Sequence, residues 1–116
     1  MDVKVDLEED PVVVRVSGRI VEGPPADDLE QALRSLIRNK RTNTIIDVSQ
    51  VAWFDSTAVG ILISHYVSSK KLDGRVLLLR ANDKIKSLMR LVHLYDRFGW
   101  ADDMSAARSW FERSAD

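Results

Sequence analysis

The chain has 116 residues, with 17 basic and 18 acidic side chains, two histidines, no cysteine and a net charge of −1. This length predicts one domain covering residues 1–116, with a core large enough to need no crosslinks. The balanced charge argues against direct nucleic-acid binding, and the lack of cysteine excludes disulfides and thiolate metal sites. Without a long apolar run or a signal-peptide core, we expect a cytoplasmic protein with no membrane insertion.

The first third of the chain predicts two strands and a helix. Residues 3–7 alternate between apolar and charged side chains, which is typical of a half-exposed strand, and residues 12–16 predict a second strand paired with it through a tight turn. We expect this strand to end at Ser17 and Gly18. Residues 19–25 then form a loop, because two adjacent prolines supply no amide donors. A helix follows, with an apolar stripe formed by Leu29, Ala32, Leu33, Leu36 and Ile37.

The far end of this first helix is basic. It carries Arg34, Arg38, Lys40 and Arg41. Cations near a helix C-terminus complement the helix dipole, which is the favoured explanation, and a basic binding patch is the alternative.

The most informative stretch is residues 44–66. Residues 44–48 are short, β-branched and nearly uninterrupted, which predicts a strand buried on both faces. A helix packed on the core follows, with a stripe formed by Val59, Leu62, Ile63, Tyr66 and Val67. Asp55 and Ser56 lie at the junction, and either side chain can cap the free amides of the first turn. This junction is the candidate site, because the Ser56 hydroxyl lies beside unpaired N–H groups and the positive end of the helix dipole.

The last third predicts another strand and two more helices. Gly74 is suited to a left-handed turn after the second helix, and residues 75–80 predict a strand parallel to residues 44–48 because a helix separates them. Asn82 and Asp83 can cap a third helix, whose stripe is Ile85, Leu88, Met89, Val92 and Tyr95. Residues 99–101 predict an edge strand, and residues 105–111 predict a last helix closing over the sheet. The expected fold is therefore α/β, with a mixed central sheet of four to five strands packed by about four helices.

A catalytic role for Ser56 is disfavoured. A serine nucleophile needs a nearby base, and the only histidines are His65 and His93. Helix geometry puts His65 on the opposite side of the second helix from Ser56, roughly 13 Å along its axis, and His93, expected in the third helix, is the less favoured alternative. Asp47 and Asp55 are better explained as strand and helix-start residues than as a metal or acid–base pair, and the histidine spacing gives no zinc pattern. We therefore predict a protein that is not an enzyme and uses no metal or cofactor.

The central residues also carry a family resemblance. Asp47-Val48-Ser49, followed by Asp55-Ser56-Thr57-Ala58-Val59-Gly60, resembles the D-x-S/T-x-x-x-x-x-D-S-S/T-G-L-G signature of STAS domains, specifically those of bacterial anti-sigma factor antagonists. The resemblance extends over residues 3–104 in element order and implies a STAS-type single domain. It further implies that Ser56 is phosphorylated by an anti-sigma factor with a histidine-kinase-like ATPase domain, and that a PP2C-type phosphatase resets it.

The implied mechanism is a switch in protein binding. Unmodified protein would bind the anti-sigma factor and so free a sigma factor for transcription, and phosphorylated Ser56 would release it. Two alternatives concern the site: Ser56 as a helix cap alone, and Thr57 as a second acceptor. A third concerns the function: a structural STAS subunit of a stressosome-like scaffold or of a phospholipid-transport ABC system.

The resemblance also implies a partner-binding surface, which joins the loop before the first helix to the start of the second. Its residues are Ile20, Val21, Glu22, Gly23, Pro24, Pro25, Asp55, Ser56 and Thr57. Trp53 is added if strand alternation turns Phe54 inward.

Two positions depart from the family pattern. The family commonly has G-E-L/I-D at the end of its second strand, whereas Gly18 is followed here by Arg19-Ile20-Val21-Glu22. Ala58 replaces the usual glycine, which adds a methyl group that could crowd a closely approaching backbone. Both changes leave the acceptor serine in place.

Overall fold

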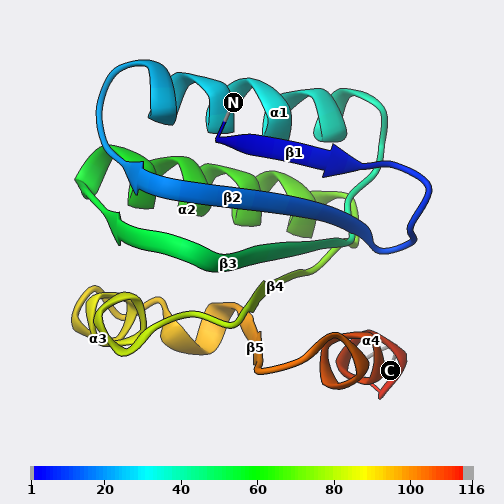
Figure 1. Cartoon of the computed structure of the whole chain (residues 1–116). Coiled ribbons are helices and arrows are strands. Elements are labelled where there is room, and N and C mark those ends of the chain that lie inside the picture. The colour runs from blue at the N-terminus through cyan, green and yellow to red at the C-terminus, as the bar shows by residue number, and fades with distance from the viewer. Residues whose placement is uncertain (1, 114–116) are drawn as a thin grey trace.

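The computed structural model describes residues 2–113, and its centre is a five-stranded sheet in the order β1-β2-β3-β4-β5 (Figure 1). The strands are β1 (Val3–Asp6), β2 (Val12–Ile20), β3 (Thr44–Phe54), β4 (Val76–Leu79) and β5 (Gly99–Ala101). β1 pairs antiparallel with β2, and every other neighbouring pair is parallel. The helices are α1 (Pro24–Arg38), α2 (Ser56–Lys71), α3 (Asp83–Leu91) and α4 (Met104–Arg113), with a short 3₁₀ turn, η1 (Tyr95–Arg97). The predicted mixed sheet packed by about four helices is confirmed.

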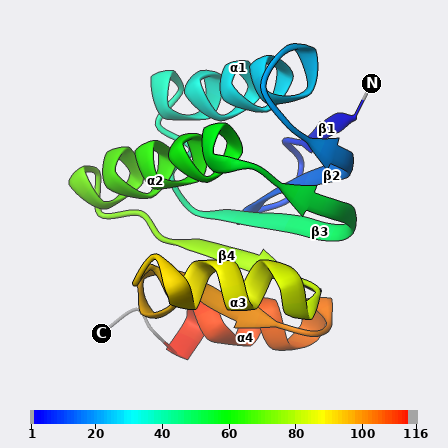
Figure 2. The same ribbon diagram turned by 90° about the vertical axis from the view of Figure 1, so that its left-hand side faces the viewer.

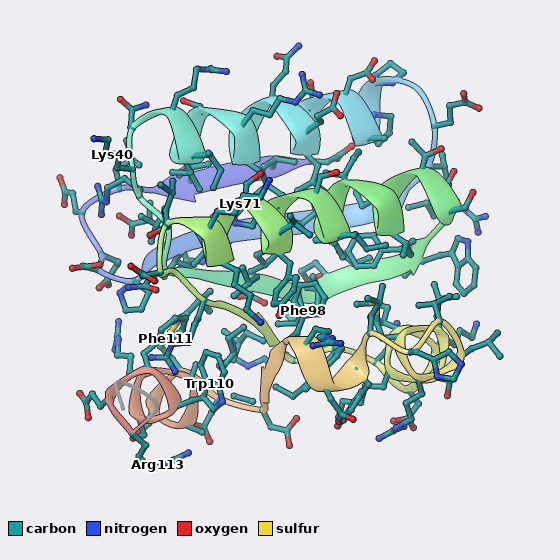
Figure 3. The ribbon with its side chains drawn as sticks, turned by 180° about the vertical axis from the view of Figure 1, so that it is seen from behind. Lys40, Lys71, Phe98, Trp110, Phe111 and Arg113 are labelled. Carbon is teal, nitrogen blue, oxygen red and sulfur yellow. The ribbon has the colours of Figure 1, made fainter. Side chains whose placement is uncertain are left out.

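Helices cover both faces of the sheet, as the apolar strands require. On one face, strand residues such as Val14, Ile46 and Leu78 share a core with residues of α1, α2 and α3. The figures show α1 and α2 side by side over this face (Figures 1 and 2). On the other face, Val13, Ile45, Leu77 and Leu79 pack against Ala107 and Phe111 of α4. Figure 3 shows Trp110 and Phe111 projecting from α4 towards the sheet. The predicted burial of residues 44–48 on both faces is confirmed, since all five are buried.

β2 continues further than the sequence predicts. It passes through Ser17 and Gly18 to Ile20, alongside a β3 that runs to Phe54. The pairing register shifts between Arg15 and Ser17 and again between Gly18 and Arg19, and Gly18 has a φ of 91°. An irregularity of this kind absorbs an extra residue without ending the strand. The prediction that residues 19 and 20 belong to a loop is therefore wrong.

Three predicted apolar patterns are only partly buried. In α2, Val67 is 41% exposed, and the buried face continues through His65 and Ser69 instead. In β1, Val3 is buried, but Val5 and Leu7 are 37% and 55% exposed, because β1 is a four-residue edge strand and Leu7 lies in the turn after it. α3 ends at Leu91, so Val92 is its exposed C-cap and Tyr95 lies in η1. Tyr95 instead stacks on Trp100 of β5, with ring centroids 4.7 Å apart.

Gly74 has a different role from the one predicted. The left-handed residue after α2 is Asp73, with a φ of 61°, and Gly74 has no positive φ. The Gly74 N–H donates to the carbonyl oxygen of Ser69 at 2.7 Å, and a Cβ at Gly74 would clash with the backbone of Thr42. Glycine is needed here for the close approach of two chain segments.

Replacing Gly74 with alanine is expected to destabilise the fold by about 1–3 kcal/mol, because the backbone at Thr42 must shift to admit a methyl group. Urea unfolding followed by circular dichroism measures this loss. Gly60→Ala is the matched control: Gly60 is exposed in α2 with no heavy atom within 4 Å of an added Cβ, so helix propensity predicts an unchanged or higher stability. An equal loss of stability in the two variants would contradict this explanation.

Candidate functional site

The loops that precede α1 and α2 meet at one end of the sheet. β2 and β3 are parallel, so their carboxyl ends lie at the same edge, from which β2 leads into α1 and β3 into α2 (Figure 1). The backbone N–H of Asp55 donates to the carbonyl oxygen of Ile20 at 3.2 Å. The loop before the first helix and the start of the second are therefore adjacent, as the family resemblance implies.

The carboxylate of Asp55 connects these two segments. Its Oδ1 accepts a hydrogen bond from the Ala58 N–H at 2.9 Å, and its Oδ2 accepts one from the Glu22 N–H at 2.8 Å. The hydrogen bond from Ala58, followed by that from Glu22, lowers the pKa of Asp55 below its usual value, so the group is ionised at neutral pH. Asp55 is thus both the N-cap of α2 and the link to the β2–α1 loop.

Ser56 is the first residue of α2, and it is exposed. Its hydroxyl makes no hydrogen bond to another residue in the range 2–113, and the neighbouring Thr57 is also exposed. The first turn of α2 itself contains no acidic side chain, so the ionised Asp55 carboxylate at the N-cap is the negative charge that complements the helix dipole there. Of the two predicted caps, only Asp55 acts as one, so the interpretation of Ser56 as the helix cap is wrong.

Most of the other predicted contact residues are exposed to solvent, but one is buried. Glu22 and Pro24 are exposed, and Val21, Gly23 and Pro25 are partly exposed. Ile20, in contrast, is fully buried at the end of β2, so the expectation of an Ile20 side chain available to a partner is wrong. Its apolar side chain belongs to the core and supports the loop from beneath.

The start of α1 is set by Gly23, its N-cap, whose φ of 109° suits glycine. Pro24 and Pro25 occupy the first helical turn rather than the loop, where their missing amides cost nothing because those amides would have no helical acceptor. The connection between β2 and α1 is therefore short and stiff.

Trp53 lies on the side of the site that faces α3. Alternation in β3 turns Phe54 inward, where it is 1% exposed, and leaves Trp53 partly exposed, as predicted. Trp53 lines a surface groove of about 430 Å³ with residues of α3, namely Asp83, Lys84, Ser87, Leu88 and Leu91. The contribution of α3 was not predicted from the sequence, because Leu88 has the spacing of an ordinary core residue and nothing local places Leu91 beside Trp53.

The two departures from the family pattern have different surroundings. The side chain of Ala58 is fully buried, so its extra methyl group packs into the core instead of crowding the exposed surface. Arg19 is exposed and lies opposite Trp53 in the β2–β3 register. Arg19 therefore contributes a positive charge near the candidate surface.

Neither histidine is bonded to Ser56. His65 is 3% exposed, its Nε2 lies 3.0 Å from Oγ1 of Thr44, and burial lowers its pKa to about 4. His93 lies in the turn after α3, rather than in the helix as predicted, and has a φ of 61°.

Asp47 and Asp55 also have separate partners. Asp47 accepts from the Ser49 N–H at 3.0 Å and lies 3.7 Å from the guanidinium of Arg80. Across residues 2–113, no group of three or more potential metal-ligating side chains is present. Over the same range, no helix has the length and apolar character needed to cross a bilayer.

These features define a small α/β domain whose candidate site is an exposed loop–helix surface at the carboxyl end of the sheet. A sequence model described as STAS domain matches residues 2–107, and the chain therefore belongs to the STAS domain family.

Solved structures share this fold at low sequence identity. An anti-sigma factor antagonist from Mycobacterium paratuberculosis is 24% identical, with a TM-score of 0.78 over 92% of this chain and 90% of that one. The unphosphorylated form of the anti-sigma factor antagonist SpoIIAA is 15% identical, with a TM-score of 0.73 over 98% and 99% of the two chains. The phosphorylated form of SpoIIAA, from Bacillus, is 16% identical, with a TM-score of 0.75 over 92% of this chain and 97% of that one. A sulfate transporter family protein from Wolinella succinogenes is 19% identical, with a TM-score of 0.72 over 87% and 84%.

Asp55→Asn is expected to lower the melting temperature by roughly 5 °C at pH 7, because a neutral amide offers one acceptor where the carboxylate offers two. The pKa of Asp55 is lower in the folded state than its value of 3.8 in the unfolded state. The stabilisation is therefore fully present above pH 3.8 and is lost as the pH falls through the folded-state pKa. The difference in melting temperature between the two proteins should therefore shrink below pH 3.8.

Calorimetric scans from pH 7 to pH 3 would measure this difference. Asp96→Asn, an exposed acid in η1, is the matched control and should change little at any pH. A gap between wild type and Asp55→Asn that stays constant with pH would contradict the role given to the carboxylate.

Proposed function

We propose that the protein is an anti-sigma factor antagonist whose binding is switched by phosphorylation of Ser56. In the unmodified state it binds an anti-sigma factor that carries a histidine-kinase-like ATPase domain, which frees a sigma factor. That partner phosphorylates Ser56 and is then released, and a PP2C-type phosphatase restores the hydroxyl. The observation that carries this proposal is the exposed Ser56 hydroxyl at the start of α2, beside the β2–α1 loop, with no hydrogen bond to another of the described residues.

In this proposal the protein is a cytoplasmic phosphoprotein that regulates transcription through protein binding. It does no chemistry of its own and contacts no DNA. The resemblance to antagonists, including one known in phosphorylated and unphosphorylated forms, supports this role.

The local charges explain how a phosphate would act. A phosphoryl group adds about −1.5 to −2 charge and three acceptor oxygens. It would stand beside the ionised Asp55 and near the exposed Glu22, whose N–H is bonded to Asp55. The free amides and positive end of α2 offset part of this repulsion, so the fold is retained. A partner packed on the same surface would have to desolvate the added anion, and binding would be lost.

The proposed partner surface combines apolar and polar residues. Val21, Pro24 and Trp53 supply partly or fully exposed apolar area, and Glu22, Asp55, Ser56 and Thr57 supply polar groups and charge. Large aromatic side chains dominate many binding interfaces, so Trp53 is the proposed anchor on the α3 side. Thr57 is proposed as a contact residue and not as a second acceptor.

Ser56→Asp is expected to weaken binding to the anti-sigma factor by about tenfold or more relative to Ser56→Ala, because a carboxylate mimics part of the added charge. Titration calorimetry with the purified partner measures both affinities. Ser105→Asp is the matched control: Ser105 is an exposed serine in the first turn of α4, which packs on the opposite face of the sheet, and should leave binding unchanged. Equal affinities for Ser56→Asp and Ser56→Ala would overturn the switch.

Phosphorylation itself is tested by incubation with the cognate kinase and ATP, followed by mass spectrometry. Modification is expected on the peptide that contains Ser56 and not on the peptide that contains Ser105. Transfer of phosphate to Thr57 alone would contradict the assignment of the acceptor.

A structural role is the second candidate, either in a stressosome-like scaffold or in a phospholipid-transport ABC system. The shared fold of a sulfate transporter family protein supports this second candidate, because that protein belongs to a family of transporters. Stable co-purification with a permease and an ATPase, together with an unmodified Ser56, would support this role over the switch.

A further inference from the structure

β1 is an edge strand, and within residues 2–113 no other strand lies on its outer side. It is the outermost strand in Figure 1, and it pairs antiparallel with β2 alone. An edge strand presents a row of backbone N–H and C=O groups with which another extended segment can pair. The Ser56 surface lies at the carboxyl ends of β2 and β3, so this edge is a separate candidate for protein binding.

The hydrogen bonds to β2 decide which residues of β1 turn their backbone groups outward. The Ser17 N–H donates to the carbonyl oxygen of Asp2 at 2.8 Å, so Asp2 turns its backbone groups towards β2. In an antiparallel ladder this orientation alternates from one residue to the next. Lys4 and Asp6 therefore also bond towards β2, and Val5, which lies between them, turns its N–H and C=O groups to the outer side.

The side chains of β1 alternate between the two faces of the sheet. Val3 is buried in the core on the α1 face, and Val5, on the same face, is 37% exposed. Lys4 and Asp6 project from the opposite face, and within residues 2–113 neither forms an ion pair. The residue opposite Lys4 in β2 is Arg15, which carries the same charge. An acidic group on the outer side of Lys4 would therefore be favourable.

The charges of β1 suit antiparallel pairing with an identical strand. When Val5 lies opposite Val5 of a second copy, the two residues exchange two backbone hydrogen bonds, and each Lys4 lies opposite an Asp6. The Lys4–Asp6 pairs are then of the kind without mutual backbone bonds, in which the side chains lie closest. Other registers that keep the faces matched place Lys4 opposite Lys4 or Asp6 opposite Asp6, which is unfavourable. The charges thus select one register.

The side of α1 that borders this edge carries small side chains. α1 packs over both β1 and β2, and Leu33 and Ile37 lie on the side of α1 that faces α2. The helical repeat of about 100° per residue puts Ala32 and Ser35 on the other side, towards the β1 edge, where both are partly exposed. A second copy related by a two-fold axis would bring its own α1 to this side in the antiparallel direction, which opposes the two helix dipoles favourably.

We propose that the β1 edge binds a second copy of this chain, through antiparallel pairing of β1 with β1 about a two-fold axis at Val5. The two five-stranded sheets then form one sheet of ten strands. The pairing covers the exposed Val5 side chains and adds two Lys4–Asp6 ion pairs on the opposite face. Only four residues of each β1 strand pair, so we expect a weak dimer with a dissociation constant on the order of 100 μM.

An exchange of charges tests the register. Lys4→Glu or Asp6→Lys alone puts like charges opposite each other twice in the dimer, so each should weaken association about tenfold in sedimentation velocity runs up to about 1 mM. The double variant Lys4→Glu, Asp6→Lys restores opposite charges and should dimerise within about threefold of wild type. Asp6 also accepts from the Glu8 N–H at 3.1 Å, but the double variant shares that loss, so it cannot explain a recovery.

A proline tests the backbone pairing. Val5→Pro removes an N–H that points outward, so it leaves the ladder to β2 intact and should prevent dimerisation. Val5→Thr is the matched control, because it keeps both the N–H and a β-branched side chain, and it should retain most of the association. Circular dichroism of both variants checks that the monomer remains folded.

The proposal is overturned if the full chain stays monomeric at about 1 mM, if the double charge variant is as weak as the single ones, or if Val5→Pro dimerises as wild type does. Association that appears only in Lys4→Ala would also overturn it, because Lys4 would then protect the edge from pairing. Ser56→Asp should dimerise as wild type does. Failure of the β1 interface and failure of the Ser56 switch are therefore distinguishable.

Discussion

The start of α2 depends on one carboxylate that holds two segments 33 residues apart in sequence. Asp55 accepts the Ala58 amide with one oxygen and the Glu22 amide with the other. Hydrogen bonds to an ionised group are stronger than neutral ones, so this pair of contacts fixes the β2–α1 loop against the helix. Because Asp55 takes the capping role, the Ser56 hydroxyl is left exposed and makes no hydrogen bond within residues 2–113.

The surroundings of Asp55 keep this arrangement rigid. Ile20 and Phe54 end their strands as almost fully buried residues, which anchors both chain segments in the core. The loop between Ile20 and Pro24 is short, and the prolines begin α1 immediately. A surface held in this way needs little ordering before it binds a partner, and a charge added to it changes recognition more than shape.

The sequence predicted much of the fold, including the adjacency of the β2–α1 loop and the start of α2, but it placed some boundaries wrongly. Ser17 and Gly18 predict the end of a strand, because serine and glycine are common both in turns and at irregularities of strand pairing. Only the neighbouring β3, which continues to Phe54, shows that the strand goes on. Gly74 is predicted as a left-handed turn residue, whereas glycine is needed there because a Cβ would clash with the backbone of Thr42. Thr42 precedes β3 and Gly74 follows α2, so a strand and a helix separate the two residues in sequence and local pattern could not reveal their contact.

The sequence by itself determined the alternation of strands and helices, the two-sided burial of residues 44–48, and the Asp-Ser pair at the start of a helix. These features follow from local spacing, because side-chain periodicity and capping act within a few residues. Tertiary structure alone decided which of Asp55 and Ser56 caps the helix, that Ile20 is buried, and that the buried His65 meets Thr44. These outcomes depend on contacts between residues distant in the chain, whose positions are set only when the parallel strands and their crossover helices pack together.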